Sequence, residues 1–183
     1  MKHLGNKNSK KRVHTVFQVD FHQKLKNGIP KRSLEQEGIQ VLLQEMNLSE
    51  WILTHRANGA PFFENNPHLH LSISHSNGWV ALMVDEKPVG IDIQTFSKNI
   101  KAGQDYFRNA QEEDFAENET ALHLIWGAKE AFYKMKQGHI TDLKEEVSIR
   151  QIDHESIILE YNNEKYTFQY VHLPSDVFLV YSM

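Results

Sequence analysis

Apolar and polar residues alternate along several short stretches of the chain, with the period of two that is typical of β-strands. The clearest alternation lies at residues 70–74, where it predicts a half-buried strand. Further strands are predicted at residues 13–19, 51–55, 79–84, 89–93, 146–152, 156–161, 165–173 and 177–182. An Asp-Glu-Lys-Pro turn separates the strands at 79–84 and 89–93, which predicts that these two strands form a hairpin.

Helical spacing of apolar residues occurs in two longer stretches. A Ser-x-x-Gln capping box that begins at Ser33 predicts a helix over residues 34–47. A second helix is predicted over residues 119–137, ending at Gly138, and residues 99–116 predict a short helix before it. A strand-rich chain with one main helix in each half predicts an α+β fold, in which the helices pack on mainly antiparallel sheets.

The charge is distributed unevenly along the chain. The 183 residues have a formal net charge of −4, but residues 1–32 carry nine cations and one anion. Two interpretations are open: this basic segment binds an anionic ligand or partner, or it is a solvated tail. The chain has no cysteine, which excludes disulfides, thiolate zinc sites, iron–sulfur clusters and cysteine nucleophiles. It shows no secretory signal and no apolar stretch of roughly 20 residues, so we expect a cytoplasmic protein without membrane association.

One group of polar residues lies on the predicted strand at residues 70–74. Its alternation places His70, Ser72 and Ser74 on one face and the apolar residues on the other. Imidazole and hydroxyl donors suit phosphate oxygens, which suggests a phosphate-binding strand end. The alternative is the solvent-facing polar side of an antiparallel sheet, which has no ligand.

A second group lies on the predicted strand at residues 89–93. Asp92 stands there between two isoleucines, although aspartate is depleted in strands and a buried carboxylate needs a partner or a metal. Gln94 is two residues away and projects from the same face. Together the two side chains offer oxygen ligands to a hard cation, unless the carboxylate lies on the wet side of an edge strand.

The third group lies on the predicted helix at residues 119–137. Helical geometry places Trp126, Lys129, Glu130 and Lys134 on one side of that helix. Glu130 and Lys134 are four residues apart, so a simple surface ion pair explains them. An aromatic side chain, two cations and a carboxylate on one side also suit a site for phosphate and metal.

The three groups occur in a specific order. His-x-Ser-x-Ser-His-Ser at residues 70–76 is followed by Gly-Ile-Asp-Ile at 90–93 and Trp-x-x-Lys-Glu-Ala-x-x-Lys at 126–134. This set resembles the 4'-phosphopantetheinyl transferases, specifically the larger, pseudo-dimeric type that activates synthetase carrier proteins such as those of surfactin synthetase. The resemblance runs from about residue 32 to residue 134. It implies a transferase unit of two similar α/β halves, approximately residues 1–90 and 91–183, with the ligand cleft between them.

The resemblance also implies an activity. These enzymes transfer the 4'-phosphopantetheine group of coenzyme A to a serine of an apo acyl or peptidyl carrier protein and release adenosine 3',5'-bisphosphate. The implied metal is Mg²⁺, with Asp92, Glu130 and Gln94 as its ligands. Lys134 is implied to contact the pyrophosphate and to assist the leaving bisphosphate, and Glu130 is the best candidate for the base that activates the serine.

Further residues are implied to bind coenzyme A. Lys129 and His70 correspond to phosphate contacts, and Arg32 with Ser33 resembles the family's pair at the start of the first helix. A phosphate at the N-terminus of a helix is physically reasonable. Because carrier proteins are typically acidic, the cations near Arg32 are suited both to coenzyme A and to that partner. A pseudo-dimeric chain holds a complete site, so we expect a monomer.

Two positions depart from the family pattern. Gln94 stands where many relatives have glutamate, and Ala60 stands where the family has a lysine. These departures leave open a relative that binds coenzyme A without catalysing transfer. A nucleic-acid binder that uses residues 1–32 has the least support, because the remainder of the chain is acidic and carries no nucleic-acid motif.

Overall fold

The computed structural model describes residues 13–18, 24 and 27–183. The chain divides into two compact units, Met1–Val89 and Gly90–Met183, which we call the N-terminal and the C-terminal unit. Most cations of the basic segment at residues 1–32 lie outside the described residues, as does the end of the predicted strand at 13–19. The similarity of the two halves, and a ligand cleft between them, stay predictions.

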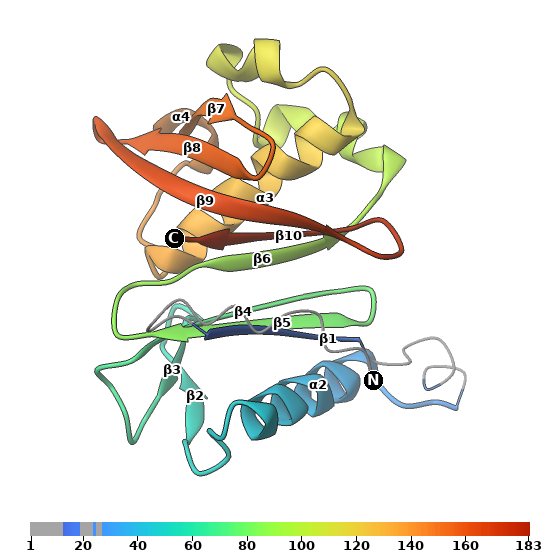
Figure 1. The fold of residues 1–183 in the computed structure, drawn as a ribbon, viewed down its shortest axis with the longest axis vertical. Coiled ribbons are helices and arrows are strands. Elements are labelled where there is room, and N and C mark those ends of the chain that lie inside the picture. The colour runs from blue at the N-terminus through green and yellow to red at the C-terminus, as the bar shows by residue number, and fades with distance from the viewer. Residues whose placement is uncertain (1–12, 19–23, 25–26) are drawn as a thin grey trace. The chain divides into compact units, whose positions relative to one another are not determined.

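The N-terminal unit is a helix on an antiparallel sheet (Figure 1). The sheet has the order β1-β5-β4, formed by Val13–Gln18, Trp79–Asp85 and His70–Ser76. Helix α2, Lys31–Glu45, packs against β1 and β5 and buries Leu34 and Leu42. A small second sheet pairs β2, Leu53–His55, with β3, Pro61–Phe63.

Helix α2 begins earlier than its sequence predicts. Pro30 is the N-cap residue, and no side chain caps the helix by a hydrogen bond. The backbone N–H of Ser33 donates to the carbonyl of Pro30 at 3.0 Å, so Ser33 already lies within the first turn. The predicted capping box is therefore wrong. The ring of Pro30 fixes its φ and starts the helix without a side-chain cap.

The C-terminal unit is a second helix on a larger antiparallel sheet (Figure 1). Its sheet has the order β6-β10-β9-β8-β7. These strands are Ile91–Thr95, Val177–Ser182, Glu164–Leu173, Ser156–Tyr161 and Ser148–Ile152. Helix α3, Glu119–Met135, packs on β10 and β6. The shorter helices are the 3₁₀ segments η1, Lys98–Tyr106, and η2, Ala110–Phe115, and helix α4, Leu143–Glu146.

Strands β5 and β6 do not form the predicted hairpin, because they belong to different sheets. Strand β6 pairs instead with β10, the last strand of the chain. At the start of β6, the N–H of Gly90 donates to the hydroxyl of Ser182, and the N–H of Ser182 donates to the carbonyl of Gly90. This pairing joins residues that are far apart in the sequence, so the local turn signal could not reveal it.

A glycine brings helix α3 close to the start of β6. A Cβ atom added at Gly90 would lie 1.8 Å from the carbonyl oxygen of Ala131. The apolar face of α3 packs on the sheet through residues such as Ile125 and Phe132, both of which are fully buried. Within the described part of the chain, no helix is long and apolar enough to cross a membrane.

Candidate active site on β6 and α3

Strand β6 turns Asp92 and Gln94 toward helix α3. Asp92 is paired with Val180 in the sheet, and Gln94 is paired with Phe178. A Cβ atom added at Gly127 of α3 would lie 2.8 Å from Val180 Cγ2 and 3.1 Å from Gln94 Nε2. Gly127 therefore allows the helix to approach this face of the sheet closely, and the site forms at that contact.

Asp92 is a buried carboxylate with defined partners. The side chain is 7% exposed. Its Oδ1 accepts from the ammonium of Lys134 at 2.6 Å, and its Oδ2 accepts from Gln94 Nε2 at 2.7 Å. Lys134 also donates to the carbonyl of Ile91 at 3.3 Å. A buried carboxylate needs such compensation, which the wet side of an edge strand would not supply.

Glu130 lies one helical turn before Lys134 and is partly buried. Its burial, and the nearby carboxylate of Asp92, raise the pKa of Glu130 above its usual range, while Lys134 partly offsets this effect. The structure thus brings Asp92, Glu130 and Lys134 together, and their catalytic and metal-binding roles stay predictions. Two carboxylates near one cation form a site that has a strong affinity for additional positive charge.

Gln94 links this cluster to His123 of helix α3. The Oε1 atom of Gln94 lies 2.7 Å from Nδ1 of His123. On the other side of the ring, Nε2 of His123 accepts from the N–H of Ser97 at 3.0 Å. Sequence analysis missed His123, although it shares the helix with Glu130 and is only 3% exposed, because an isolated histidine carries no motif.

The donor set fits Mg²⁺. Magnesium uses oxygen ligands and binds proteins through one or two carboxylates, with its remaining positions filled by water and substrate phosphate. Asp92 and Glu130 supply two carboxylates. Among the residues that the structure describes, no three His, Asp or Glu side chains form a cluster that could hold a metal ion. Water and substrate phosphate would therefore have to complete the coordination of a metal at this site.

Lys129 is placed differently from the sequence prediction. Its side chain is fully buried, and its ammonium lies 2.9 Å from Glu112 Oε1 and donates to the carbonyl of Phe107 at 2.7 Å. A third, longer contact goes to the carbonyl of Lys144. Since these oxygens take up its donors and no solvent-facing surface remains, the phosphate contact predicted for Lys129 is corrected to a structural ion pair.

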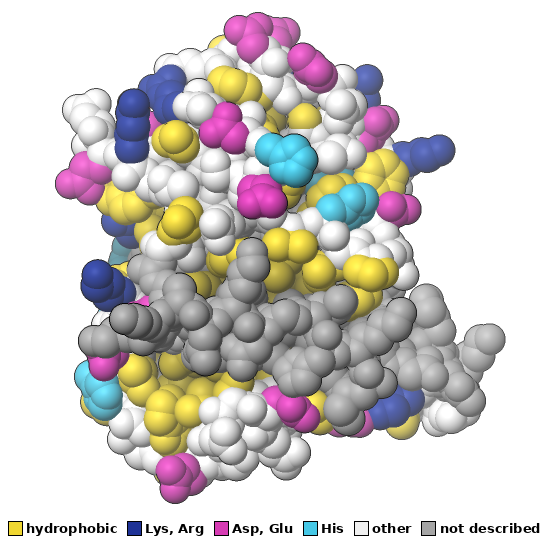
Figure 2. Space-filling model, viewed as in Figure 1, with side chains coloured by type: hydrophobic (Ala, Val, Ile, Leu, Met, Phe, Trp, Pro, Cys, Tyr) yellow, Lys and Arg dark blue, Asp and Glu magenta, His cyan; other side chains and the backbone are white. Residues whose placement is uncertain are grey.

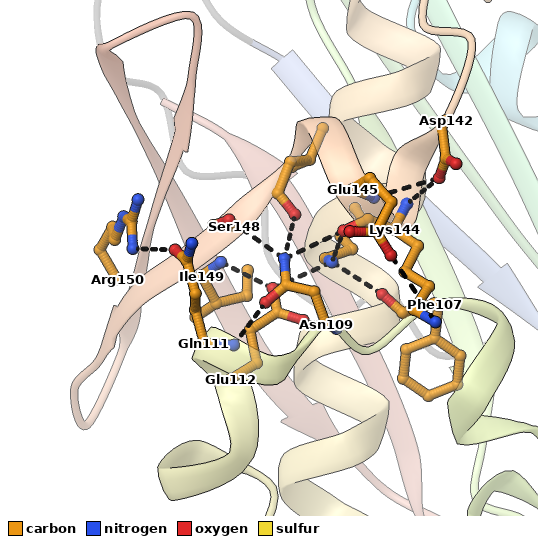
Figure 3. Close-up of polar contacts among 12 residues, drawn as sticks. Phe107, Asn109, Gln111, Glu112, Asp142, Lys144, Glu145, Ser148, Ile149 and Arg150 are labelled. Atoms are coloured by element: carbon orange, nitrogen blue, oxygen red, sulfur yellow. Dashed lines mark hydrogen bonds and ion pairs between the residues drawn. The ribbon is translucent and has the colours of Figure 1, made fainter.

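Glu112 and Asn109 form a buried polar network that sequence analysis missed (Figure 3). The Glu112 carboxylate accepts from the N–H of Asn109 at 2.9 Å and from the N–H of Ile149 at 2.7 Å. The Asn109 side chain donates to the hydroxyl of Ser148. The signal was present in the sequence, because Asn109 and Glu112 form a capping box of η2. The network ties η2 and β7 to the side of α3 that carries Lys129.

The predicted phosphate-binding residues of the N-terminal unit have a mixed placement. His70 is partly buried; burial lowers its pKa, as does the nearby Arg56, while Asp85 raises it. Ser72 and Ser74 are 2% and 5% exposed, and a phosphate contact on this face of β4 stays a prediction.

At the start of α2, the predicted residues lie in solvent. Arg32 and Ser33 are exposed on the first turn of the helix. Neighbouring cations are already paired, Lys24 with Glu37 and Lys31 with Glu35 at 3.5 Å. The first turn of α2, all of which the structure describes, contains no acidic side chain. A phosphate contact of Arg32 and Ser33 stays a prediction.

A family model described as the 4'-phosphopantetheinyl transferase superfamily matches residues 88–179, half of the chain. The chain belongs to this superfamily. The match covers β6, α3 and the first half of β10, so Asp92, Glu130 and Lys134 lie within the matched segment. The mixed helices and antiparallel sheets agree with the α+β fold of 4'-phosphopantetheinyl transferases.

Curated relatives carry the same family name. The chain is 32% identical over 94 residues to the 4'-phosphopantetheinyl transferase psf-1 of Bacillus pumilus, which covers 48% of this chain and 40% of the relative. It is 31% identical over 101 residues to gsp of Aneurinibacillus migulanus, an alignment that covers 51% of this chain and 42% of the relative. It is 26% identical over 123 residues to Sfp of Bacillus subtilis (strain 168), an alignment that covers 64% of this chain and 53% of the relative. The chain thus spans about half the length of the curated relatives it matches.

The described surface of this superfamily member carries charges of both signs. On the face shown in Figure 2, the Lys and Arg side chains of the described residues are scattered among Asp, Glu and His side chains. A nucleic-acid backbone is usually bound by a continuous basic patch. The described part of this face offers no such patch.

Proposed function

We propose that the chain is a Mg²⁺-dependent 4'-phosphopantetheinyl transferase. Its substrates are coenzyme A and the serine of an apo acyl or peptidyl carrier protein, and its second product is adenosine 3',5'-bisphosphate. The observation that carries this proposal is the cluster of Asp92, Glu130 and Lys134, which lies within the segment that matches the family.

The reaction needs a base and a compensating positive charge. The serine oxygen forms a bond to the phosphorus that bears pantetheine, and the bond from that phosphorus to the bridging oxygen breaks. Glu130, the carboxylate that lies on α3 one turn before Lys134, accepts the serine proton. The bridging oxygen leaves with the bisphosphate, and Lys134 stabilises the negative charge that develops there.

Asp92 orients the cluster. Its contact with Lys134 holds the ammonium at a fixed place, 2.6 Å from Oδ1, so that less reorganisation is needed during transfer. Asp92 and Glu130 would hold Mg²⁺, which when bound neutralises charge on the phosphoryl oxygens. Arg32, Ser33 and His70 are proposed to contribute phosphate contacts for coenzyme A, which favour binding more than chemistry.

The test is the intact mass of a carrier protein. An apo carrier is incubated with coenzyme A, Mg²⁺ and the chain, and the expected gain is one phosphopantetheinyl group per carrier serine. Replacement of that serine by alanine in the carrier is the matched control and should abolish the gain. A series of apo acyl and peptidyl carriers that all keep their original mass would contradict the proposal.

A second function is favoured by two specific residues. Gln94 and Ala60 stand where the family pattern has an acid and a lysine, which suits a relative that binds coenzyme A without transfer. Titration calorimetry with coenzyme A separates the two functions. Binding of coenzyme A together with unchanged carrier mass supports the second function, whereas binding with a mass gain supports the first.

A further inference from the structure

The orientation of the Gln94 amide can be worked out from a backbone group. The N–H of Ser97 is a fixed donor, and it lies 3.0 Å from Nε2 of His123. A hydrogen on Nε2 would meet the Ser97 hydrogen directly, so Nε2 carries none. The carbonyl of Ser97 lies farther from Nε2, at 3.3 Å. The neutral ring therefore carries its hydrogen on Nδ1.

This tautomer determines which end of the amide faces which neighbour. Nδ1–H of His123 needs an acceptor, which is Gln94 Oε1 at 2.7 Å. The NH₂ group of Gln94 then faces Asp92 and donates to Oδ2 at 2.7 Å. Hydrogen bonds thus run in one direction along a chain of four groups, from Ser97 through His123 and Gln94 to Asp92.

Packing holds both side chains of this chain in place. The ring of His123 stacks on Phe178, with centroids 5.3 Å apart and an angle of 15° between the planes, and it lies 5.5 Å from the ring of Phe96. Gln94 is limited on its other side by Gly127, where an added Cβ would come within 3.1 Å of Nε2. Burial lowers the pKa of His123, and the hydrogen bond at Ser97 and the Asp92 carboxylate partly offset this effect.

We propose that Gln94 is a positioning residue rather than a metal ligand: His123 and Ser97 orient its amide so that its NH₂ group, not its oxygen, faces Asp92. The inference rests on the proposed function, because the group that it positions is the Asp92 carboxylate of the transfer site. It also explains the departure from the family pattern. A glutamine can donate to Asp92, whereas a glutamate at this position can only accept.

The tautomer of His123 is the direct readout. Ring ¹⁵N shifts of the labelled full chain distinguish Nδ1–H from Nε2–H, and His123→Phe identifies the signal by removing it. We expect the Nδ1–H tautomer, without metal and at saturating Mg²⁺. An Nε2–H tautomer in either condition would overturn the inference, because Nδ1 would then accept from Gln94 and the amide oxygen would face Asp92. His139, which is exposed, serves as an internal control for an unconstrained ring.

Two variants add a functional readout. His123→Phe keeps the aromatic stacking but removes the hydrogen bonds, and Gln94→Met keeps the side-chain length but cannot donate to Asp92. Each is expected to lower the transfer rate by about tenfold, the typical effect of losing a group that orients a ligand. The double variant should be no slower than the slower single variant, because both changes break the same chain. If the rate losses of the two single variants multiply in the double variant, the inference is contradicted.

The outcome is separable from that of the proposed function. Tautomer measurement needs neither coenzyme A nor a carrier protein. An Nδ1–H tautomer in a chain that modifies no carrier would contradict the proposed function and leave the orientation of Gln94 established. Transfer activity in a chain with the Nε2–H tautomer would support the proposed function and overturn the positioning role.

Discussion

The candidate residues of the two units differ in their surroundings. In the C-terminal unit, Asp92 is 5% exposed and is held by Lys134 and Gln94. In the N-terminal unit, Arg32 and Ser33 are exposed on the first turn of α2. Charges that are withdrawn from water interact more strongly than charges in solvent, and salt screens them less. Under the proposed function, we therefore expect the C-terminal unit to supply the chemistry and the N-terminal residues to supply binding.

The largest effect is expected in the C-terminal unit, from Glu130→Gln. The variant keeps the shape of the side chain but cannot accept the serine proton, so the transfer rate should fall by at least about a hundredfold. Initial rates of carrier modification measure the change. Glu113→Gln, at an exposed position of η2, is the matched control and should keep the wild-type rate. If Glu130→Gln retains full activity, the base assignment is wrong.

Lys129→Met tests the buried side of the same helix. Removing the ammonium leaves the Glu112 carboxylate buried without its ion-pair partner, although two backbone N–H groups still donate to it. Breaking a buried ion pair costs about 3–5 kcal/mol in the free energy of unfolding. Chemical denaturation measures the loss, with exposed Lys165→Met as the control. An unchanged unfolding free energy would show that the pair does not support the unit.

Gly90→Ala tests whether α3 must lie close to β6. The added Cβ would be 1.8 Å from the carbonyl oxygen of Ala131, so helix or strand has to shift. Overpacking of this kind costs about 1–3 kcal/mol in unfolding free energy, and the shift should also slow transfer, because Asp92 follows two residues later. At Gly103 an added Cβ has nothing within 4 Å, so Gly103→Ala is the control. Equal stability of the two variants would contradict the close approach.

The stability of the metal-free chain should depend on pH through Glu130. Its pKa is raised in the folded state from the ordinary value of 4.5, mainly by burial, so folding binds the proton more tightly. The resulting stabilisation is present below pH 4.5 and is lost as pH rises through the raised pKa. Urea denaturation in EDTA should therefore show the unfolding free energy of wild type falling relative to Glu130→Gln over that interval. A constant difference would show that Glu130 is not desolvated.

The smallest effect is expected in the N-terminal unit, from Arg32→Ala. An exposed guanidinium that contacts phosphate contributes to binding in the ground state and the transition state alike. The KM for coenzyme A should rise by about tenfold or less, with kcat unchanged. Steady-state kinetics measures both constants, with exposed Lys87→Ala as a charge-matched control. A loss of kcat as large as that of Glu130→Gln would remove the distinction between the units.

Sequence periodicity predicted most individual elements, because side-chain alternation is a local property. Helix α3 and strands β4, β5 and β8 to β10 lie close to their predicted ranges. The predicted hairpin failed because β6 pairs with β10, which only long-range packing decides. Likewise, β3 and α4 were not predicted, since each is only a few residues long and has little periodicity.

Residues of the candidate site could be predicted where they belong to a sequence motif. They could not be predicted where their placement depends on burial and long-range contacts. Asp92, Glu130 and Lys134, which the ordered motifs single out, lie together in the structure, and their roles stay predictions. Lys129 belongs to the same motif as Glu130 and Lys134, but its side chain pairs with Glu112. No rule of sequence spacing identifies Glu112 as that partner. His123 could not be found either, because its role depends on contacts with β6 and with Ser97.

The central claim is that the cluster on β6 and α3 transfers phosphopantetheine. The most direct measurement is the intact mass of an apo carrier protein after incubation with coenzyme A, Mg²⁺ and either wild type or Asp92→Ala, with circular dichroism as a check that both are folded. We expect wild type to add one phosphopantetheinyl group and Asp92→Ala to add none. Equal modification by both proteins, or modification by neither, would contradict the claim.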